Sequence, residues 1–178
     1  MSAEKISIDQ AKPDKLFYVV ANAVVYRPED GRCLILKRDE REKVHPGKWA
    51  TIGGKLEQGD LDINKPSKVE GDVLVFSNPL FKLLGREAME EAGVTIVPPL
   101  VFINESLIVR PDGIPVQLIT FGARYGGGEV RPEKGAFTNS AWVNEVEVDS
   151  YPTIGSVSEE VKTTIAHFKT EVSLQVSY

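Results

Sequence analysis

The sequence of 178 residues lacks several features that mark specialised proteins. It has one cysteine, Cys33, only two histidines, and no apolar run long enough to cross a bilayer. A single cysteine cannot form an intramolecular disulfide, and the short apolar runs argue against a membrane-spanning helix. No charged segment followed by an apolar core occurs at Met1, so we expect a cytoplasmic protein with no membrane partner.

Basic residues are also scarce relative to acidic ones. The chain has 21 Lys and Arg against 26 Asp and Glu, for a formal net charge of -5. Proteins that grip polymeric nucleic acid neutralise its phosphates with clustered Lys and Arg, so we do not expect such a partner. A small phosphorylated ligand remains compatible, because a divalent cation can neutralise clustered carboxylates and hold phosphates as well.

Length and composition are those of one ordinary globular domain. The chain is 42% hydrophobic and 26% charged, and its length suits a single core, so we expect one domain over residues 1–178. Residues 1–15 are polar and predict a lead-in without a motif. Cys33 lies in the apolar run 33–36, which favours a buried core thiol over a nucleophile.

The order of expected elements predicts an α/β fold. β-rich runs before and after a central helix indicate a mixed sheet covered by helices on its faces. A turn signal at 110–113 predicts a hairpin there. The expected strands are 16–26, a run ending at 36, 49–52 leading into a Gly-Gly loop, 94–109, 114–125, 141–143 and a final one after 169, with 126–139 a loop and 158–169 a second helix.

The central helix carries the clearest local signals. Asn78 is expected to cap its first turn, Pro79 suits the first helical position, and Gly93 supplies the stop. The apolar residues of the buried face recur at helical spacing: Leu80, Leu83, Leu84, Ala88 and Ala92. Residues 61–77, just before this helix, fit a helix poorly and predict an inserted loop or hairpin.

Three acidic residues share one side of this helix. At about 100° per residue, Glu87, Glu90 and Glu91 span an arc of roughly 100°, so their carboxylates crowd together. Such like-charge pairs destabilise an isolated helix by roughly 0.2 to 0.5 kcal/mol each, and a hard divalent cation reverses that cost. The alternative is a solvated acidic face softened by Arg86 and Lys82. A Gly-Gly segment nearby, which can add carbonyl ligands, favours the metal.

These segments resemble the two halves of the Nudix box. The family pattern has Gly, five residues, Glu, seven residues, then Arg-Glu, an aliphatic residue, any residue, Glu-Glu, any residue, Gly and an aliphatic residue. Gly54 fits the opening, and residues 86–94 fit the whole closing half, with Ala88 in the aliphatic position. Residues 46–49 before the Gly-Gly segment and the later Trp142 also resemble family features, so the likeness covers roughly residues 17–170.

The resemblance implies a Nudix-type α/β/α sandwich, a Mg²⁺ or Mn²⁺ cofactor and a set of site residues. The implied metal ligands are Glu87, Glu90, Glu91 and the carbonyl of Gly53. Arg86 would orient a carboxylate, with an exposed surface pair as its alternative. A carboxylate from a later loop, Glu133 or Glu129, would serve as base or ligand, although surface positions are the alternative for both. The implied catalytic residues are Arg86, Glu90, Glu91 and Glu133.

Two features depart from the family pattern. Asp60 stands where the family has Glu, which keeps the charge but shortens its reach. Residues 61–85 place 25 residues where the pattern has seven, so the box is split by an insertion that we locate at 61–77. Closure entropy grows slowly with loop length, so the site survives if the insertion leaves and re-enters at nearby points. A lid, a homodimer contact and a neutral surface excursion are all open roles for it.

The prediction for function is a metal-dependent hydrolase that cleaves a phosphoanhydride bond in a nucleoside-diphosphate-linked substrate. Modified nucleoside triphosphates and nucleotide sugars are both open as substrates. The chief alternative is a non-catalytic Nudix-like module that binds or senses a nucleotide. Isomerisation of a prenyl diphosphate would need a well-placed catalytic cysteine, and Cys33 is a poor candidate. His45 is a possible substrate contact in a charged loop, and His167 is expected to be structural.

Overall fold

The computed structural model describes the backbone of residues 3–175 and the side chains of residues 3–170. Neither of its α-helices combines the length and hydropathy that crossing a membrane requires, within that described part. The elements, in chain order, are a 3-10 turn Pro13–Lys15, β1 Tyr18–Arg27, β2 Arg32–Arg38, β3 Trp49–Ala50, β4 Ile52–Lys55, a 3-10 turn Gln58–Asp60, β5 Lys68–Glu70, β6 Val73–Val75, α1 Pro79–Ala92, β7 Val94–Val109, β8 Pro115–Gly128, β9 Phe137–Val143, a 3-10 turn Glu147–Ser150 and α2 Val157–Gln175.

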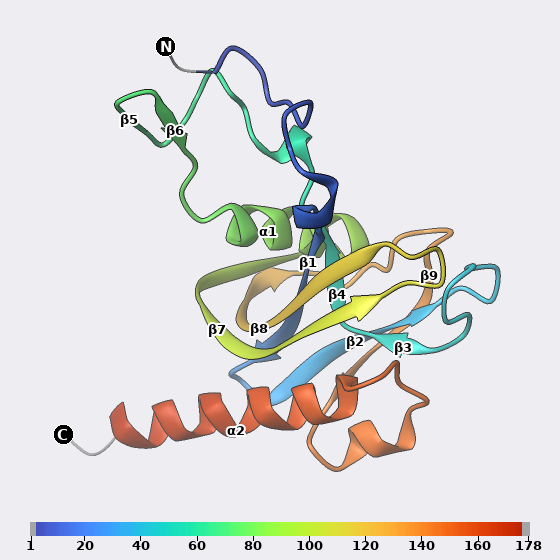
Figure 1. Cartoon of the computed structure of the whole chain (residues 1–178). Helices are drawn as coiled ribbons and strands as arrows, with labels where there is room; N and C mark the ends of the chain where they lie inside the picture. The colour runs from blue at the N-terminus through green and yellow to red at the C-terminus, as the bar shows by residue number, and fades with distance from the viewer. Residues whose placement is uncertain (1–2, 176–178) are drawn as a thin grey trace.

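The central sheet is mixed, as predicted. Its strand order is β3-β2-β1-β8-β7, with β4 paired to β1 and β9 paired to β2 (Figure 1). β1 and β8 run parallel, and the other pairs of this sheet are antiparallel. β4 pairs with β1 alone, so its second edge is not covered by another strand among the described residues.

The two helices cover opposite faces of this sheet (Figure 1). Alternate residues of β1 belong to two separate apolar cores: Ala21 and Ala23 pack under α1, whereas Val24 and Tyr26 pack under α2. This alternation follows from the two-residue period of a strand that is buried on both faces. The predicted α/β/α sandwich is therefore confirmed.

Helix α1 follows its sequence signals except at the residue that precedes it, Asn78. Pro79 occupies the first turn, and the buried face predicted for this helix packs on the sheet. Gly93 ends the helix in a left-handed conformation, φ 69°, with its N–H donating to the carbonyls of Ala88 and Met89. The predicted side-chain cap by Asn78 is wrong, because Asn78 itself is left-handed, φ 53°, and its side chain makes no cap hydrogen bond.

Several predicted boundaries also need correction. Gly53 and Gly54 lie within strand β4 and not in a loop, because both pair with β1. β8 runs to Gly128 and β9 begins at Phe137, so the loop expected over 126–139 is shorter. The strand expected after residue 169 is wrong as far as residue 175, where α2 continues, and residues 176–178 lie outside the described part.

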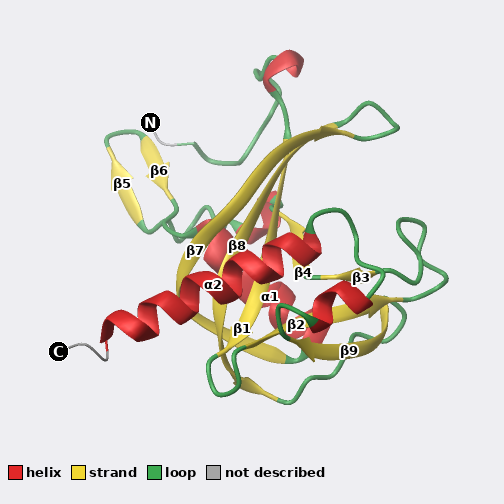
Figure 2. Cartoon of the chain, turned by 90° about the horizontal axis from the view of Figure 1, so that it is seen from below, coloured by secondary structure: helices red, strands yellow, loops and turns green. Residues whose placement is uncertain are grey.

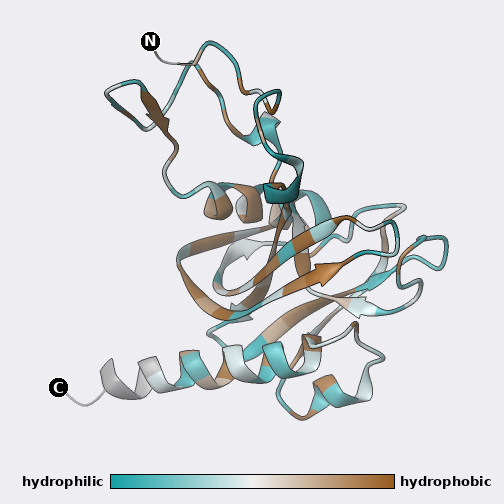
Figure 3. Cartoon of the chain, viewed as in Figure 1, coloured by the Kyte–Doolittle hydropathy of each residue, from teal (hydrophilic) through white to brown (hydrophobic). Residues whose placement is uncertain are grey.

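Residues 61–77 contain a small antiparallel hairpin, β5–β6, which forms a sheet of its own. A pocket of about 420 Å³ lies between this hairpin and the N-terminal lead-in, lined by Lys5 and Ile6 on one side and Leu74 and Phe76 on the other. The predicted lead-in thus lies beside the hairpin and away from the main sheet (Figure 1). Figure 3 shows that β6 is hydrophobic although it stands apart from both cores.

Candidate active site

The carboxylates of α1 meet the glycines of β4. The backbone N–H of Gly53 donates to Glu91 Oε2 at 3.0 Å. Glu87 lies against Gly54 so closely that a Cβ at position 54 would stand 2.1 Å from Glu87 Oε1. A side chain at position 54 would therefore displace the Glu87 carboxylate, and glycine leaves room for this close approach.

Arg86 lies among three carboxylates. Its guanidinium is 3.2 Å from Asp60 Oδ1, 3.0 Å from Glu87 Oε1 and 2.9 Å from Glu90 Oε2. Asp60 is held in turn by the N–H of Glu57, which donates to Asp60 Oδ2 at 2.8 Å. Asp60 thus links Arg86 to the turn that follows β4. Glu57 takes part in this link through its backbone N–H.

The ion pair of Asp60 and Arg86 also explains how the split motif is closed. These residues flank the 25 residues that separate the two halves, and their side chains are within 3.3 Å of each other. The insertion therefore leaves and re-enters the fold at adjacent points. This is the condition under which the site can accommodate an insertion within the motif. The two halves, distant in sequence, are brought together in space.

A loop after β8 covers the C-terminal end of α1. The N–H of Arg131 donates to the carbonyl of Ala92 at 2.8 Å, and the N–H of Glu133 donates to the carbonyl of Glu91 at 2.9 Å. These bonds satisfy helix carbonyls that have no partner within the helix. They also fix Glu133 near Glu91, whereas Glu129 lies on the surface in an ion pair with Arg131.

The electrostatics of the site single out Glu91. Burial raises the pKa of Glu91 to about 8, against the lowering effect of the Gly53 N–H, and the charges of Glu87 and Glu133 raise it further. Burial also raises the pKa of Glu87, which Arg86 opposes. A carboxylate with a pKa near neutrality, set among like charges, is typical of functional sites.

The predicted cluster of three carboxylates is only partly assembled. Glu87 and Glu91 face β4, but Glu90 is 54% exposed and turned toward Arg86. Among the described side chains, no group of three or more His, Cys, Asp or Glu is arranged to hold a metal ion. The contact from Gly53 is made by its N–H, and its predicted carbonyl ligand role stays a prediction.

The donor set nevertheless fits a hard divalent cation in its chemistry. Glu87 and Glu91 offer carboxylate oxygens, and Glu133 adds a third negative charge that acts on Glu91. Mg²⁺ and Mn²⁺ prefer such oxygen donors over nitrogen and sulfur. A cation would also offset the repulsion from Glu87 and Glu133, which adds to the effect of burial on the pKa of Glu91.

A pocket of about 460 Å³ opens beside these carboxylates. It is lined by Gly53, Gly54, Lys55, Arg86 and Glu87, with Val20, Arg38, Val44 and Glu57 completing its wall. Three basic residues and two acidic residues thus line the same space, which suits a phosphorylated ligand held with metal. Val20 and Val44 were not predicted, because the place of Val20 depends on the pairing of β1 with β4 and that of Val44 on the course of the loop between β2 and β3.

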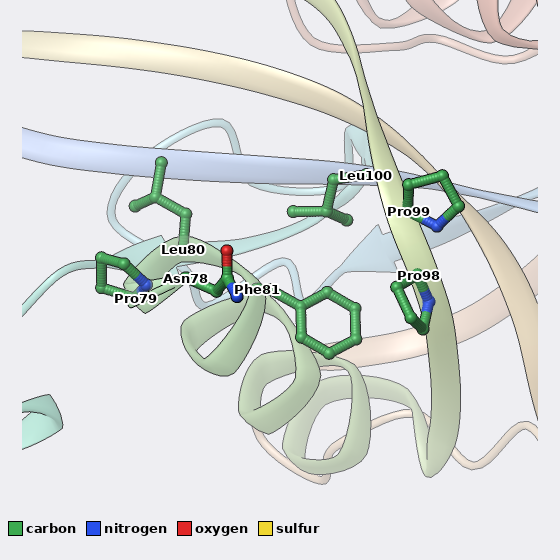
Figure 4. Close-up of a pocket in the computed structure, with 7 residues that line it drawn as sticks. All are labelled: Asn78, Pro79, Leu80, Phe81, Pro98, Pro99 and Leu100. Carbon is green, nitrogen blue, oxygen red and sulfur yellow. The ribbon is translucent and has the colours of Figure 1, made fainter. Parts of the chain in front are cut away.

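A larger cavity of about 700 Å³ lies elsewhere, at the N-terminal end of α1 (Figure 4). Its lining consists of Asn78, Pro79, Leu80, Phe81, Pro98, Pro99 and Leu100. None of these side chains titrates or carries charge, so this cavity offers no group for acid–base chemistry and no carboxylate for a metal ion. The smaller pocket beside α1 is therefore the candidate active site.

The remaining candidates lie outside this pocket. Cys33 is buried in the core under α2, and burial raises the pKa of its thiol, so it is no nucleophile. His45 lies in the exposed loop between β2 and β3, and His167 packs edge-on against Phe168 on α2. Trp142 packs under Arg27, whose guanidinium carbon is 4.0 Å from the ring centroid.

Comparison with solved structures shows the class of fold. The MutT protein of Methanosarcina mazei Go1 is 20% identical, with a TM-score of 0.58 over 90% of this chain and 98% of that one. The ORF135 protein of E. coli is 18% identical, with a TM-score of 0.59 over 87% and 93%. The NUDIX domain of Shewanella oneidensis NrtR, solved with ADP ribose, is 14% identical, with a TM-score of 0.57 over 84% and 90%.

No protein-family model and no curated protein matches the chain. The structural likeness, at 20% identity or less for these three, shows the fold alone: the chain has the Nudix fold. Its candidate active site lies where the two halves of the Nudix-like motif meet.

Proposed function

We propose that this protein is a metal-dependent hydrolase that cleaves a phosphoanhydride bond in a nucleoside-diphosphate-linked substrate. The observation that carries the proposal is the contact of Arg86 with Asp60 and Glu87, which joins the halves of the split motif beside the pocket. The buried Glu91, with like charges around it, supports the same conclusion. A fold held only by apolar contacts would not need this cluster of charged side chains beside a pocket.

Each residue has a distinct part in the proposed reaction. Glu87 and Glu91 would hold Mg²⁺ or Mn²⁺, and Arg86 keeps Glu87 in place. When bound, the cation supplies charge neutralisation for the diphosphate and lowers the pKa of water in the site. Glu133 accepts a proton from the attacking water. The oxygen of that water bonds to phosphorus while the bond from phosphorus to the bridging oxygen breaks. Two phosphorylated fragments leave.

A non-catalytic nucleotide-binding module is the second candidate. It is favoured by the exposed position of Glu90. It is also favoured because, among the described side chains, no group of three or more His, Cys, Asp or Glu is arranged to hold a metal ion. The solved NUDIX domain of NrtR with ADP ribose supports a nucleotide-like ligand for either candidate. The retained carboxylates Glu87 and Glu91 favour hydrolysis, since binding alone does not need them.

Incubation with a nucleotide panel separates the two candidates. The purified protein is mixed with nucleoside triphosphates and nucleoside diphosphate sugars in Mg²⁺, in Mn²⁺ and in chelator, and the phosphorylated products are resolved by chromatography. We expect metal-dependent release of two phosphorylated fragments from at least one substrate. Saturable binding without turnover under either metal would replace the hydrolase with the binding module.

A further inference from the structure

A second pocket of about 530 Å³ continues from the carboxylate pocket. The two share Val20, Val44 and Lys55 in their linings, so they form one groove. One end of it holds Glu87 and Arg86, and the other reaches the β7–β8 turn at Arg110 and Asp112. A substrate whose phosphates lie at the carboxylates therefore extends toward this turn.

The floor of the second pocket is a patch of neighbouring strands. Val20 of β1 is in register with Lys55 of β4 and Leu118 of β8, and Val116 is in register with Ile108 of β7. Residues in register on adjacent strands point to the same face. The floor is therefore aliphatic from β1 across β8 to β7, with Lys55 of β4 at its edge.

This floor belongs to the face of the sheet that α2 covers farther along. Val20 has the same parity on β1 as Val24, which packs in the core under α2. Figure 2 shows the β7–β8 hairpin extending past α2. The strands beyond the helix thus leave an apolar strip open beside the candidate active site.

The polar groups of this second pocket are few. Arg110 and Asp112 form an ion pair with each other at 2.7 Å, and Asp112 Oδ1 also accepts from the N–H of Ile114 at 3.3 Å. Lys55 is the remaining charged lining residue. The lining side chains include no amide, no hydroxyl and no aromatic ring. A base placed there finds aliphatic contacts but no set of side-chain donors and acceptors matched to its edge.

We propose that this groove binds the organic group of the substrate by size and apolar contact, so that the enzyme discriminates weakly between bases. The inference rests on the proposed function for the position of the diphosphate. Lys55, which lines both pockets, contacts the phosphate nearest the organic group. Val20, Val44, Ile108 and Leu118 determine how large that group is.

The expected selectivity follows from the chemistry of the lining. A hydrophobic pocket separates related ligands by about 10-fold to 200-fold, whereas a site built to hydrogen-bond a ligand rejects an unmatched one by roughly 10⁴-fold or more. The catalytic efficiency for substrates that differ only in their base should therefore stay within about 100-fold.

The test uses two substitutions on opposite walls and a matched control. Ile108→Trp and Val44→Trp add an indole at half-exposed or exposed positions, so both variants should fold. Leu107→Trp adds the same ring to the same strand but on the other face, because Leu107 is in register with Gln117 and not with Val116. Ile108 is 44% exposed and Leu107 59% exposed, so the two sites are comparable in solvation.

Two readouts are taken for each protein: kcat and KM with nucleotides of all four bases, and calorimetric Kd for α,β-methylene nucleoside diphosphates in Mg²⁺. We expect Ile108→Trp and Val44→Trp to raise KM and Kd at least 10-fold with kcat within about threefold, and Leu107→Trp to change neither. Circular dichroism checks that each variant is folded.

The outcomes separate this inference from the proposed function. If the wild type binds the analogues but shows no turnover, and Ile108→Trp weakens that binding, the groove is supported as a binding site and the proposed hydrolase activity is wrong. Turnover with a preference of more than about 1000-fold for one base keeps the hydrolase and overturns the inference. Equal effects of Ile108→Trp and Leu107→Trp, or no binding of any analogue, also overturn it.

Discussion

The two faces of the sheet each hold a buried or half-buried glutamate, and their surroundings differ. Glu160, on α2, is 4% exposed, and its Oε1 accepts from Ser156 Oγ at 2.8 Å, Thr120 Oγ1 at 3.2 Å and Asn104 Nδ2 at 3.3 Å. Glu91, on α1, accepts one backbone N–H, and its pKa is raised by burial first and then by the charges of Glu87 and Glu133.

The contrast distinguishes a structural carboxylate from a functional one. Of the three neutral donors around Glu160, Asn104 and Thr120 tie α2 to β7 and β8, and Ser156 lies at the start of α2 itself. Neutral donors of this kind are the usual way a buried polar group is satisfied. Around Glu91, the N–H of Gly53 and the charge of Arg38 do not offset burial and the charges of Glu87 and Glu133, so the pKa stays raised. The charged form of Glu91 is therefore unfavourable in this protein. We attribute this to function, because a bound cation would stabilise the charged form.

The largest expected effect is on turnover at Glu91. Glu91→Gln keeps the size and an oxygen that accepts from Gly53, but removes the charge that holds the cation. We expect catalytic efficiency to fall about 100-fold to 1000-fold, as when a group that stabilises charge in the transition state is lost. The matched control is Glu160→Gln, for which activity should stay within about threefold. Equal losses in both variants would erase the contrast between the two faces.

A smaller loss is expected when Arg86 is released from the turn. Asp60→Ala removes the ion pair at 3.2 Å that holds Arg86 beside Glu87. Catalytic efficiency should fall about 10-fold to 100-fold, the range for groups that orient a ligand. Asp62→Ala is the control, since Asp62 pairs with the exposed Lys65 and accepts from the N–H of Asn64, and it has no contact with Arg86 among the described interactions. Full activity of Asp60→Ala would show that Arg86 is placed without the aspartate.

The smallest effect concerns stability on the α2 face. Glu160→Leu leaves the donors of Asn104, Thr120 and Ser156 without their acceptor, so the free energy of unfolding should drop by about 1–3 kcal/mol. Glu160→Gln keeps an acceptor and should cost less. Urea unfolding measures both. A Glu160→Leu protein as stable as the wild type would mean that the network does not hold α2 on the sheet.

Local signals in the sequence predicted much of this fold. The helix ending at Gly93, the β7–β8 hairpin and the mixed sheet all follow from turn residues and apolar spacing. The errors occur where a tertiary contact overrides the local preference. Glycine has a low strand propensity, so Gly53 and Gly54 were predicted to form a loop, but their pairing with β1 makes them part of a strand. Likewise, α2 continues past residue 169 although the residues there have a high strand propensity.

The site was predicted in its residue types but not in its arrangement. The helical arc placed Glu87, Glu90 and Glu91 together, yet Arg86 holds Glu90 on the exposed side. Competition for one guanidinium cannot be read from helical spacing. The groove over Val20 and Leu118 was also missed, since its residues come from strands that meet only in the folded sheet.

The central claim is that Glu91 exchanges its proton for a divalent cation. Its pKa is raised to about 8, so in the metal-free protein at pH 7 the carboxyl carries a proton, which Mn²⁺ binding must release. Calorimetric titration with Mn²⁺ in two buffers of different ionisation enthalpy measures that release directly. We predict close to one proton released at pH 7 by the wild type and by Glu160→Gln, and none by Glu91→Gln. No saturable Mn²⁺ binding, or the same proton release from Glu91→Gln, would contradict the claim.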